Sequence, residues 1–267
     1  MAVITKMQVQ KASKERYNIY IDKGYGEEYG FSVDESTLAK HGLRKGMEID
    51  ELELADILYD EEVRQCYLKA IVFLSYQMRT KQEIEEHLSK KDYGVAVIQE
   101  AIHKLIQAGY VNDQEYAIAY VRTQYNVGSK GPIIIRRELM GKGIPQDVVI
   151  SSLHEYTEDK QITNAIQLCE KKRKTLKNLS AFQLKKKLEE MLMRKGYPSS
   201  IIAIAMEEQE DQDADEEWTA ALKQGSKLHD KYKKDRDTYK MKMKQSLYRK
   251  GFQLETIERV IQELSEE

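Results

Sequence analysis

The side chains of this chain whose types and spacing could do chemistry are mostly cationic, and they are concentrated in its second half. Residues 171–195 carry ten basic and two acidic side chains, and residues 223–250 carry eleven basic and three acidic ones. Ammonium and guanidinium groups at this density bind phosphate or carboxylate groups and do not by themselves break covalent bonds. The two stretches therefore predict either a surface for nucleic acid or an acidic partner, or solvated helix faces.

A single lysine also recurs at regular intervals, one residue before the same position of a repeated pattern. The four members of this lysine row are Lys91, Lys142, Lys195 and Lys250. One interpretation is that each lysine ends a helix, where the helix dipole stabilises a cation by about 0.3–1 kcal/mol. The other is that the row binds a partner whose anionic groups repeat along the array. The sequence leaves both interpretations open.

The candidate partner- or DNA-binding residues are accordingly all basic. They comprise the lysine row, basic side chains of residues 122–137 and members of the two basic stretches. The full set is Lys91, Arg122, Lys130, Arg136, Arg137, Lys142, Lys171, Lys172, Arg173, Lys174, Lys185, Lys186, Lys187, Arg194, Lys195, Lys242, Lys244, Arg249 and Lys250.

Catalysis and cofactor binding find no support in the sequence. The five histidines have no metal-ligand spacing, and no nucleophile-elbow, zinc-protease or phosphate-loop motif is present. Cys66 and Cys169 lie in separate helical patterns, which favours packed thiols over a disulfide or a metal pair. Eight carboxylates crowd residues 207–217, which indicates a solvated linker rather than a divalent-cation site. We expect a protein that is not an enzyme and has no cofactor and no metal.

A repeated pattern organises these side chains. Two apolar residues four apart are followed, four residues later, by Gly, then by an aromatic or apolar residue and a second apolar pair. Its position for Gly recurs at intervals of 51, 53 and 55 residues. The four copies begin Ile84, Leu88, Asp92; Ile135, Leu139, Gly143; Leu188, Leu192, Gly196; and Met243, Leu247, Gly251. Such regularity is typical of a tandem-repeat protein, which presents long surfaces rather than a catalytic pocket.

The pattern predicts modules of three helices. The first apolar pair marks one helix, the Gly ends it in the left-handed conformation, and the second pair marks another helix. A further helix fits upstream of each copy, within residues 66–77, 114–124, 161–177 and 216–234. All three prolines, Pro132, Pro145 and Pro198, stand at expected helix starts. Thr80 with Glu83, and Ser180 with Gln183, have the spacing of capping boxes.

The first sixty residues follow a different pattern. Residues 4–9 and 17–21 are rich in β-branched and aromatic side chains and predict a hairpin, with shorter strands at 31–33 and 47–49 and a helix at 34–41. The predicted fold is therefore mainly α, with tandem three-helix repeats forming an elongated curved array and a small, mainly β N-terminal appendage. We predict domains at residues 1–58, 59–112, 113–158, 159–209 and 210–267.

Composition bears on the compartment. Charged residues make up 33% of the chain and the mean hydropathy is −0.66. No apolar run approaches the roughly 20 residues of a membrane-spanning helix, and the N-terminal residues lack the apolar core of a signal peptide. We expect a cytoplasmic monomer that does not contact a membrane.

One stretch of the chain resembles a known family. Residues 109–144 resemble the signature of the RecX family, regulators of the RecA recombinase. The matching residues are Gly109, Tyr110, Asp113, Tyr116, Ala117, Tyr120, Val121, Arg122, Gly128, Gly131, Pro132, Ile135, Arg136, Glu138, Leu139, Lys142, Gly143 and Ile144. The preceding helices are also similar, and the fourth repeat with an N-terminal appendage resembles the longer members found in Gram-positive bacteria.

The resemblance implies three-helix modules and binding in the groove of the RecA–DNA filament. We therefore predict a non-enzymatic regulator of recombination and DNA repair that modulates filament assembly and strand exchange. Its expected partner is the RecA filament, and single- or double-stranded DNA is a further candidate. Two alternatives stay open: a helical repeat that binds DNA directly, and a generic helical adaptor.

Overall fold

The structure is a computed structural model of the whole chain, and it describes residues 1–11, 13–128, 130–208, 214–234 and 237–266. The described residues form thirteen helices and one sheet of four strands, so the predicted mainly helical fold with a β-rich N-terminal part is confirmed. The chain divides into two compact units. Unit 1 comprises residues 1–116 and 142–144, and unit 2 comprises residues 117–141 and 145–267.

The N-terminal part of unit 1 is an antiparallel sheet with the strand order β3-β2-β1-β4. Its elements are β1 (Ala2–Gln10), β2 (Ser13–Asp22), β3 (Glu27–Asp34), α1 (Glu35–Lys40) and β4 (Glu48–Ile49). All four strands and the helix were predicted. The strands of the hairpin are longer than expected, because residues 13–16 belong to β2 rather than to the connection. Alternating side chains such as Ile4, Ile19 and Val33 are fully buried and form the core of this part.

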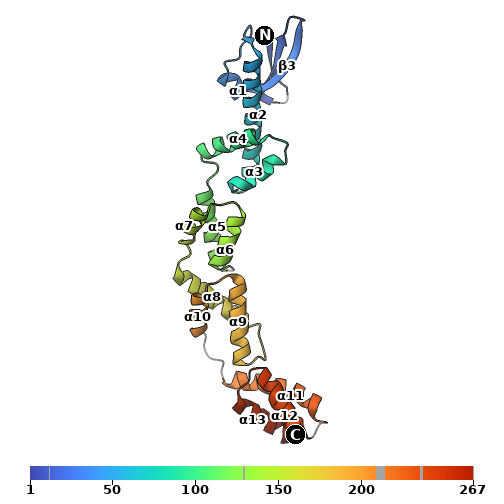
Figure 1. Cartoon of the computed structure of the whole chain (residues 1–267), viewed down its shortest axis with the longest axis vertical. Helices are drawn as coiled ribbons and strands as arrows, with labels where there is room; N and C mark the ends of the chain where they lie inside the picture. Colours follow the sequence, from blue (N-terminus) through green and yellow to red (C-terminus); the bar gives the residue numbers. More distant parts are fainter. Residues whose placement is uncertain (12, 129, 209–213, 235–236, 267) are drawn as a thin grey trace. The chain divides into compact units, whose positions relative to one another are not determined.

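A long helix, α2 (Glu51–Leu74), joins the sheet to the first module (Figure 1). The expected boundary at residue 58 falls inside this helix. Glu61, which is buried on α2, accepts hydrogen bonds from Arg16 Nη1 and from the backbone N–H of Asp34, both at 2.7 Å. Because a buried carboxylate must be paired, these two contacts fix the sheet to the helix.

Each module consists of three helices, as the pattern predicted. Module 1 contains α2, α3 (Lys81–Ser89) and α4 (Val95–Gln107), and module 2 contains α5 (Asp113–Val127), α6 (Pro132–Gly141) and α7 (Gln146–Leu153). Module 3 contains α8 (Glu158–Arg173), α9 (Ala181–Lys195) and α10 (Ser199–Glu207), and module 4 contains α11 (Ala214–Tyr232), α12 (Tyr239–Arg249) and α13 (Leu254–Glu266). The apolar pair of each copy lies on the middle helix and is buried. These pairs are Ile84 and Leu88, Ile135 and Leu139, Leu188 and Leu192, and Met243 and Leu247.

The turn after each middle helix is left-handed, as predicted. The φ angles of Gly143, Gly196 and Gly251 are 77°, 81° and 77°. Asp92, which replaces Gly in the first copy, has a φ of 62° and keeps the same conformation. Asp adopts this region more readily than most residues other than Gly and Asn, so the first turn is conserved in shape despite the substitution.

Helix starts also follow the sequence signals. Thr80 and Glu83 form a complete capping box at α3, and Ser180 accepts a hydrogen bond from Gln183 N at α9. Pro132 is the first residue of α6, and Pro145 and Pro198 precede α7 and α10. No helix in the described part of the chain is long and apolar enough to span a membrane.

Candidate partner-binding surface

At three junctions, the start of one middle helix contacts the turn in the next copy of the repeated pattern. At the first junction, in unit 1, Thr80 Oγ1 at the start of α3 donates a hydrogen bond to the carbonyl oxygen of Lys142, at 2.9 Å. Thr80 Oγ1 also accepts from Glu83 N, so one buried hydroxyl caps α3 and holds the turn that ends α6. A Cβ on Gly143 would lie 2.7 Å from Cβ of Gln82, which shows how closely the two segments approach.

The second junction, in unit 2, is made through backbone groups. Gly131 N donates to the carbonyl oxygen of Lys195 at 2.7 Å, and Ile133 N donates to the carbonyl oxygen of Gly196 at 3.1 Å. The N–H groups of the first turn of α6, which have no partner within the helix, therefore pair with carbonyl groups at the end of α9. A Cβ on Gly131 would lie 2.6 Å from Tyr197 N, and a Cβ on Gly196 would lie 2.7 Å from Ile134 N.

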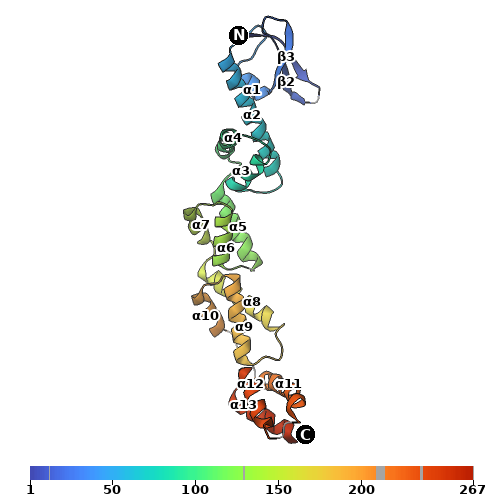
Figure 2. The same cartoon turned by 45° about the vertical axis from the view of Figure 1, so that its right-hand side comes forward.

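The third junction, also in unit 2, again uses a hydroxyl. Ser180 Oγ donates to the carbonyl oxygen of Lys250 at 2.5 Å, and a Cβ on Gly251 would lie 2.8 Å from Cδ1 of Phe182. The C-terminus of α12 therefore abuts the N-terminus of α9, just as the C-terminus of α9 abuts the N-terminus of α6. These three middle helices follow one another end to end within unit 2 (Figure 2).

The junctions give the lysine row a role that the sequence did not indicate. The carbonyl oxygens of Lys142, Lys195 and Lys250 are the groups that the preceding middle helix binds. Lys91 belongs to the first module, and its turn follows no earlier module. A backbone carbonyl does not require lysine, so the choice of side chain needs a separate explanation at each position.

The side chains of the row differ in their surroundings. Lys142 Nζ lies 2.5 Å from Glu83 Oε1, across the first junction. Burial alone would raise the pKa of Glu83, but hydrogen bonds from Lys142 and Thr80 N hold that pKa below its usual value. Burial alone would lower the pKa of Lys142, but its bond to Glu83 raises that pKa. Lys250 Nζ donates to Gln224 Oε1 at 3.0 Å, whereas Lys91 is exposed.

The other candidate residues divide into paired and unpaired groups. The paired ones are Arg122 with Glu155, Lys130 with Glu138, Arg173 with Glu216 and Lys244 with Glu258. Within the described ranges, no ion pair is formed by Lys91, Arg136, Arg137, Lys171, Lys172, Lys174, Lys185, Lys186, Lys187, Arg194 or Arg249. On α9 the buried Leu184 and Leu188 set the inward face, which leaves residues 185–187 exposed to solvent. This helix therefore offers cations that are not already neutralised by a neighbouring carboxylate.

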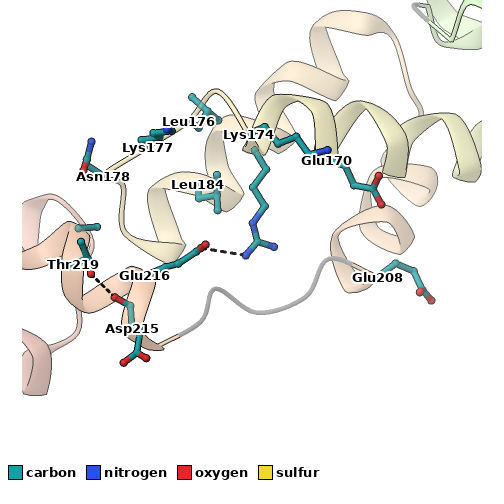
Figure 3. Close-up of a pocket in the computed structure, with 12 residues that line it drawn as sticks. Glu170, Lys174, Leu176, Lys177, Asn178, Leu184, Glu208, Asp215, Glu216 and Thr219 are labelled. Carbon is teal, nitrogen blue, oxygen red and sulfur yellow. Dashed lines mark hydrogen bonds and ion pairs between the residues drawn. The ribbon is translucent and has the colours of Figure 1, made fainter.

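A cavity of about 820 Å³ lies between α8 and the start of α11 in unit 2 (Figure 3). Arg173, Lys174 and Lys177 line it together with acidic residues that include Glu170, Asp215 and Glu216. Arg173 Nη2 is 3.7 Å from Glu216 Oε2. Because opposite charges share the walls, the cavity does not form a site for an anion or for a cation. Glu208, Asp215 and Glu216 of the acidic stretch predicted as a linker line it, and residues 209–213 of that stretch lie outside the described residues.

The cysteines and histidines of the described residues form no group that could hold a metal ion. Cys66 and Cys169 are buried and are not disulfide-bonded, and burial raises the pKa of each thiol to about 11. Both thiols are therefore protonated at neutral pH and pack as small apolar side chains.

Sequence reasoning missed a set of exposed apolar side chains on the middle helices. Met140, Met193 and Tyr248 each stand one residue after the buried leucine of the pattern, and all three are exposed. Their common position in three copies was visible in the sequence. The pattern of buried residues drew attention away from it, because an exposed apolar residue is ordinary when it occurs singly.

Four protein-family models match five segments of the chain. Residues 2–50 match the regulatory protein RecX N-terminal domain, residues 66–105 match the first RecX three-helix domain and residues 112–151 match the second. Residues 158–206 and 215–261 both match the third three-helix domain. The fourth module is thus similar to the third, as expected for an added repeat.

Similar proteins and solved structures agree with this match. The chain is 56% identical over 269 residues to regulatory protein RecX of Bacillus cereus (strain G9842), and 55% identical to that of Bacillus cytotoxicus, with both chains covered in full. A crystal structure of regulatory protein RecX matches with a TM-score of 0.69 at 34% identity, over 78% of this chain and 100% of that chain. RecX from Lactobacillus salivarius matches with a TM-score of 0.53 at 34% identity, over 56% of this chain and 97% of that chain.

Proposed function

Because this chain belongs to the RecX family of regulatory proteins, we propose that it regulates a RecA-type recombinase by binding along the recombinase–DNA filament. The observation that supports this function is the similarity over the whole chain, which includes the N-terminal part and all four modules. The family is one of regulators, and the function that we propose requires no covalent chemistry from this chain.

We propose that the unpaired cations of modules 3 and 4 make the electrostatic contacts to this partner. Lys185, Lys186 and Lys187 are exposed on one helix and form no ion pair within the described residues. Acidic groups of the filament or DNA phosphates bind such cations without first displacing an internal carboxylate. Other exposed cations of these modules that form no ion pair within the described residues, such as Lys171 and Arg249, would add to these contacts, and the lysine row would add side chains at the junctions.

Linked modules suit a partner made of repeated subunits. Once one module is bound, the next binds at a high effective concentration, so weak contacts add up without any deep pocket. Bound modules would then exclude an incoming duplex from the filament or change the exchange of recombinase subunits. We further propose that the protein acts as a cytoplasmic monomer and that DNA is contacted as part of the filament.

A strand-exchange assay tests the proposed function. Adding the protein to a RecA filament on single-stranded DNA should change the rate of strand exchange in a manner that saturates with concentration. The variant Lys185→Glu, Lys186→Glu, Lys187→Glu should bind the filament more weakly and with a flatter dependence on salt, because fewer counterions are released. A matched charge reversal at the exposed Lys11, Lys14 and Lys45 of the N-terminal part should leave binding unchanged.

Two outcomes would contradict the proposal. An unchanged strand-exchange rate at saturating protein would exclude regulation of the recombinase. Tight binding to naked DNA, with no added affinity for the filament, would instead favour a direct DNA-binding repeat. If the protein bound neither the filament nor naked DNA, the generic helical adaptor would be favoured.

A further inference from the structure

The middle helices of unit 2 expose large apolar side chains to solvent. Each of α6, α9 and α12 carries two of them, and the six are between 45% and 65% exposed. We name this set the apolar lane; it consists of Ile133, Met140, Phe182, Met193, Met241 and Tyr248. Scattered apolar residues are normal on a surface, but pairs that recur on three equivalent helices are not scattered.

Equivalent positions of the repeat supply half of the lane. Met140, Met193 and Tyr248 directly follow Leu139, Leu192 and Leu247, the buried leucines of the pattern. The corresponding residue of module 1 is Ser89, and α3 exposes no large apolar side chain. The lane is therefore specific to modules 2 to 4 and does not follow from the requirements of the three-helix fold.

The junctions bring the ends of the three helices that carry the lane together within unit 2. The N-terminus of α6 abuts the C-terminus of α9 through Gly131 and Lys195, and the N-terminus of α9 abuts the C-terminus of α12 through Ser180 and Lys250. Figures 1 and 2 show the three helices following one another along unit 2. A partner that repeats along an axis could contact each helix in turn.

The charge of the same helices selects an acidic partner. Helices α6, α9 and α12 carry eleven basic and three acidic side chains. One of the three carboxylates, that of Glu138, is occupied by Lys130 Nζ and by the hydroxyl of Tyr120. Helix α3 carries one lysine and three glutamates, so the absence of the lane in module 1 coincides with the opposite sign of charge.

The chemical types in the lane favour a protein surface over nucleic acid. Bases stack on aromatic side chains, and only Phe182 and Tyr248 are aromatic. Three of the six are methionines, whose flexible side chains adapt to apolar protein surfaces. Methionine, aromatic residues and arginine are also enriched at protein–protein interfaces.

We propose that the apolar lane is the docking surface for successive subunits of an acidic protein polymer, each of which accepts apolar side chains from one middle helix. This assignment rests on the proposed function, in which that polymer is the recombinase filament. The lane supplies affinity that persists in salt, and the flanking cations supply electrostatic attraction and register.

A pair of triple variants tests the assignment. Met140→Gln, Met193→Gln and Tyr248→Gln together remove one apolar side chain from each middle helix. Val127→Gln, Ile150→Gln and Leu254→Gln form the control, because these residues are also in unit 2 and are 44% to 68% exposed but lie on other helices. All six positions are at the surface, so both variants should keep the wild-type helix content, as checked by circular dichroism.

The measurement is the affinity of each protein for a RecA filament on single-stranded DNA, at two salt concentrations, with naked single-stranded DNA as a second ligand. The lane variant should lose roughly 100-fold in filament affinity at both salt concentrations, if each side chain acts as a moderate interface anchor. The control variant should stay within about threefold of wild type by the same reasoning for surface positions outside an interface. Neither variant should change the affinity for naked DNA.

Each contrary result has a distinct meaning. If the lane variant keeps wild-type affinity for the filament, or if both variants lose affinity equally, the apolar lane is not the docking surface, while the proposed function stands. An equal loss on naked DNA assigns the lane to nucleic acid and overturns the protein partner. Failure of the wild-type protein to bind the filament overturns the proposed function, and the lane assignment fails with it.

Discussion

At both the first and the second junction, a donor at the start of one middle helix binds a carbonyl oxygen in the next copy of the pattern, but the donor groups differ. At the first, the hydroxyl of Thr80 binds the carbonyl oxygen of Lys142, and an ion pair between Lys142 and Glu83 reinforces the contact. At the second, the backbone N–H groups of Gly131 and Ile133, at the start of α6, bind the carbonyl oxygens of Lys195 and Gly196. What the two junctions share is a left-handed glycine, Gly143 or Gly196, at which a Cβ would overlap the neighbouring segment, so both turns depend on the absence of a side chain.

The largest loss of stability is expected from Gly196→Val at the second junction. Valine would be strained at a φ of 81°, at a cost of about 1–2 kcal/mol, and its Cβ would also overlap Ile134, at a further ~1–3 kcal/mol. The control is Gly109→Val, because Gly109 has a φ of 75° but no atom within 4 Å of its would-be Cβ. Urea denaturation followed by circular dichroism should show the larger loss for Gly196→Val. Equal losses of stability in the two variants would mean that the left-handed turn alone explains why residue 196 is glycine.

The second-largest loss of stability is expected from Gly131→Ala, which tests the backbone contact of the second junction directly. The new methyl group would meet the main chain of Gly196 and Tyr197, which cannot move aside as a side chain could, and should cost about 2–3 kcal/mol of the free energy of unfolding. Gly141→Ala, at the last residue of α6, is the control, since nothing lies within 4 Å of its would-be Cβ. The same denaturation experiment should find the control neutral or slightly stabilised. A neutral Gly131→Ala would show that the second junction opens easily.

A smaller effect is expected from Thr80→Val at the first junction. The valine keeps the shape of threonine but leaves Lys142 O and Glu83 N without their partner, at a cost of about 2 kcal/mol. Thr157→Val is the control, because Thr157 precedes α8 without making a side-chain cap. Thermal unfolding should separate the two variants. Similar midpoints would indicate that the hydroxyl of Thr80 contributes no more than an ordinary exposed cap position.

The smallest loss of stability is expected from Lys142→Met, which removes the ion pair of the first junction. Both side chains are partly exposed, so the loss at neutral pH should be no more than about 1 kcal/mol.

The pKa of Glu83 is lowered in the folded protein, so its contribution to stability is present above pH 4.5 and is lost as the pH falls through the folded pKa. The pKa of Lys142 is raised, so its contribution is present below pH 10.5 and is lost only above that value. Unfolding measured across acidic pH should therefore show wild type and variant converging below pH 4.5. A constant difference would assign the loss to packing of the lysine stem.

Much of the fold could be predicted because its signals are local. The period of Ile84, Leu88 and their equivalents determined the middle helices, and the Gly positions, capping residues and prolines determined where helices begin and end. Even Asp92 keeps the left-handed turn. The candidate surface could be predicted less well from such local signals, because Lys142 and Lys185 are both lysines and the sequence does not distinguish them. Among the described residues, Lys142 forms an ion pair and Lys185 does not, and sequence spacing does not encode a contact with Glu83 from another module.

The sequence by itself determined the number of modules, the helices within them and the excess of cations in the second half, since each depends on residue type and on separations of a few positions. Only the tertiary structure decided why Gly196 must be glycine, which cations stay unpaired and that Met140, Met193 and Tyr248 lie exposed on helices joined end to end. These properties depend on contacts between segments fifty or more residues apart in the chain. Helix periodicity places a side chain on one face of its own helix, and the neighbouring module then decides whether that face is covered.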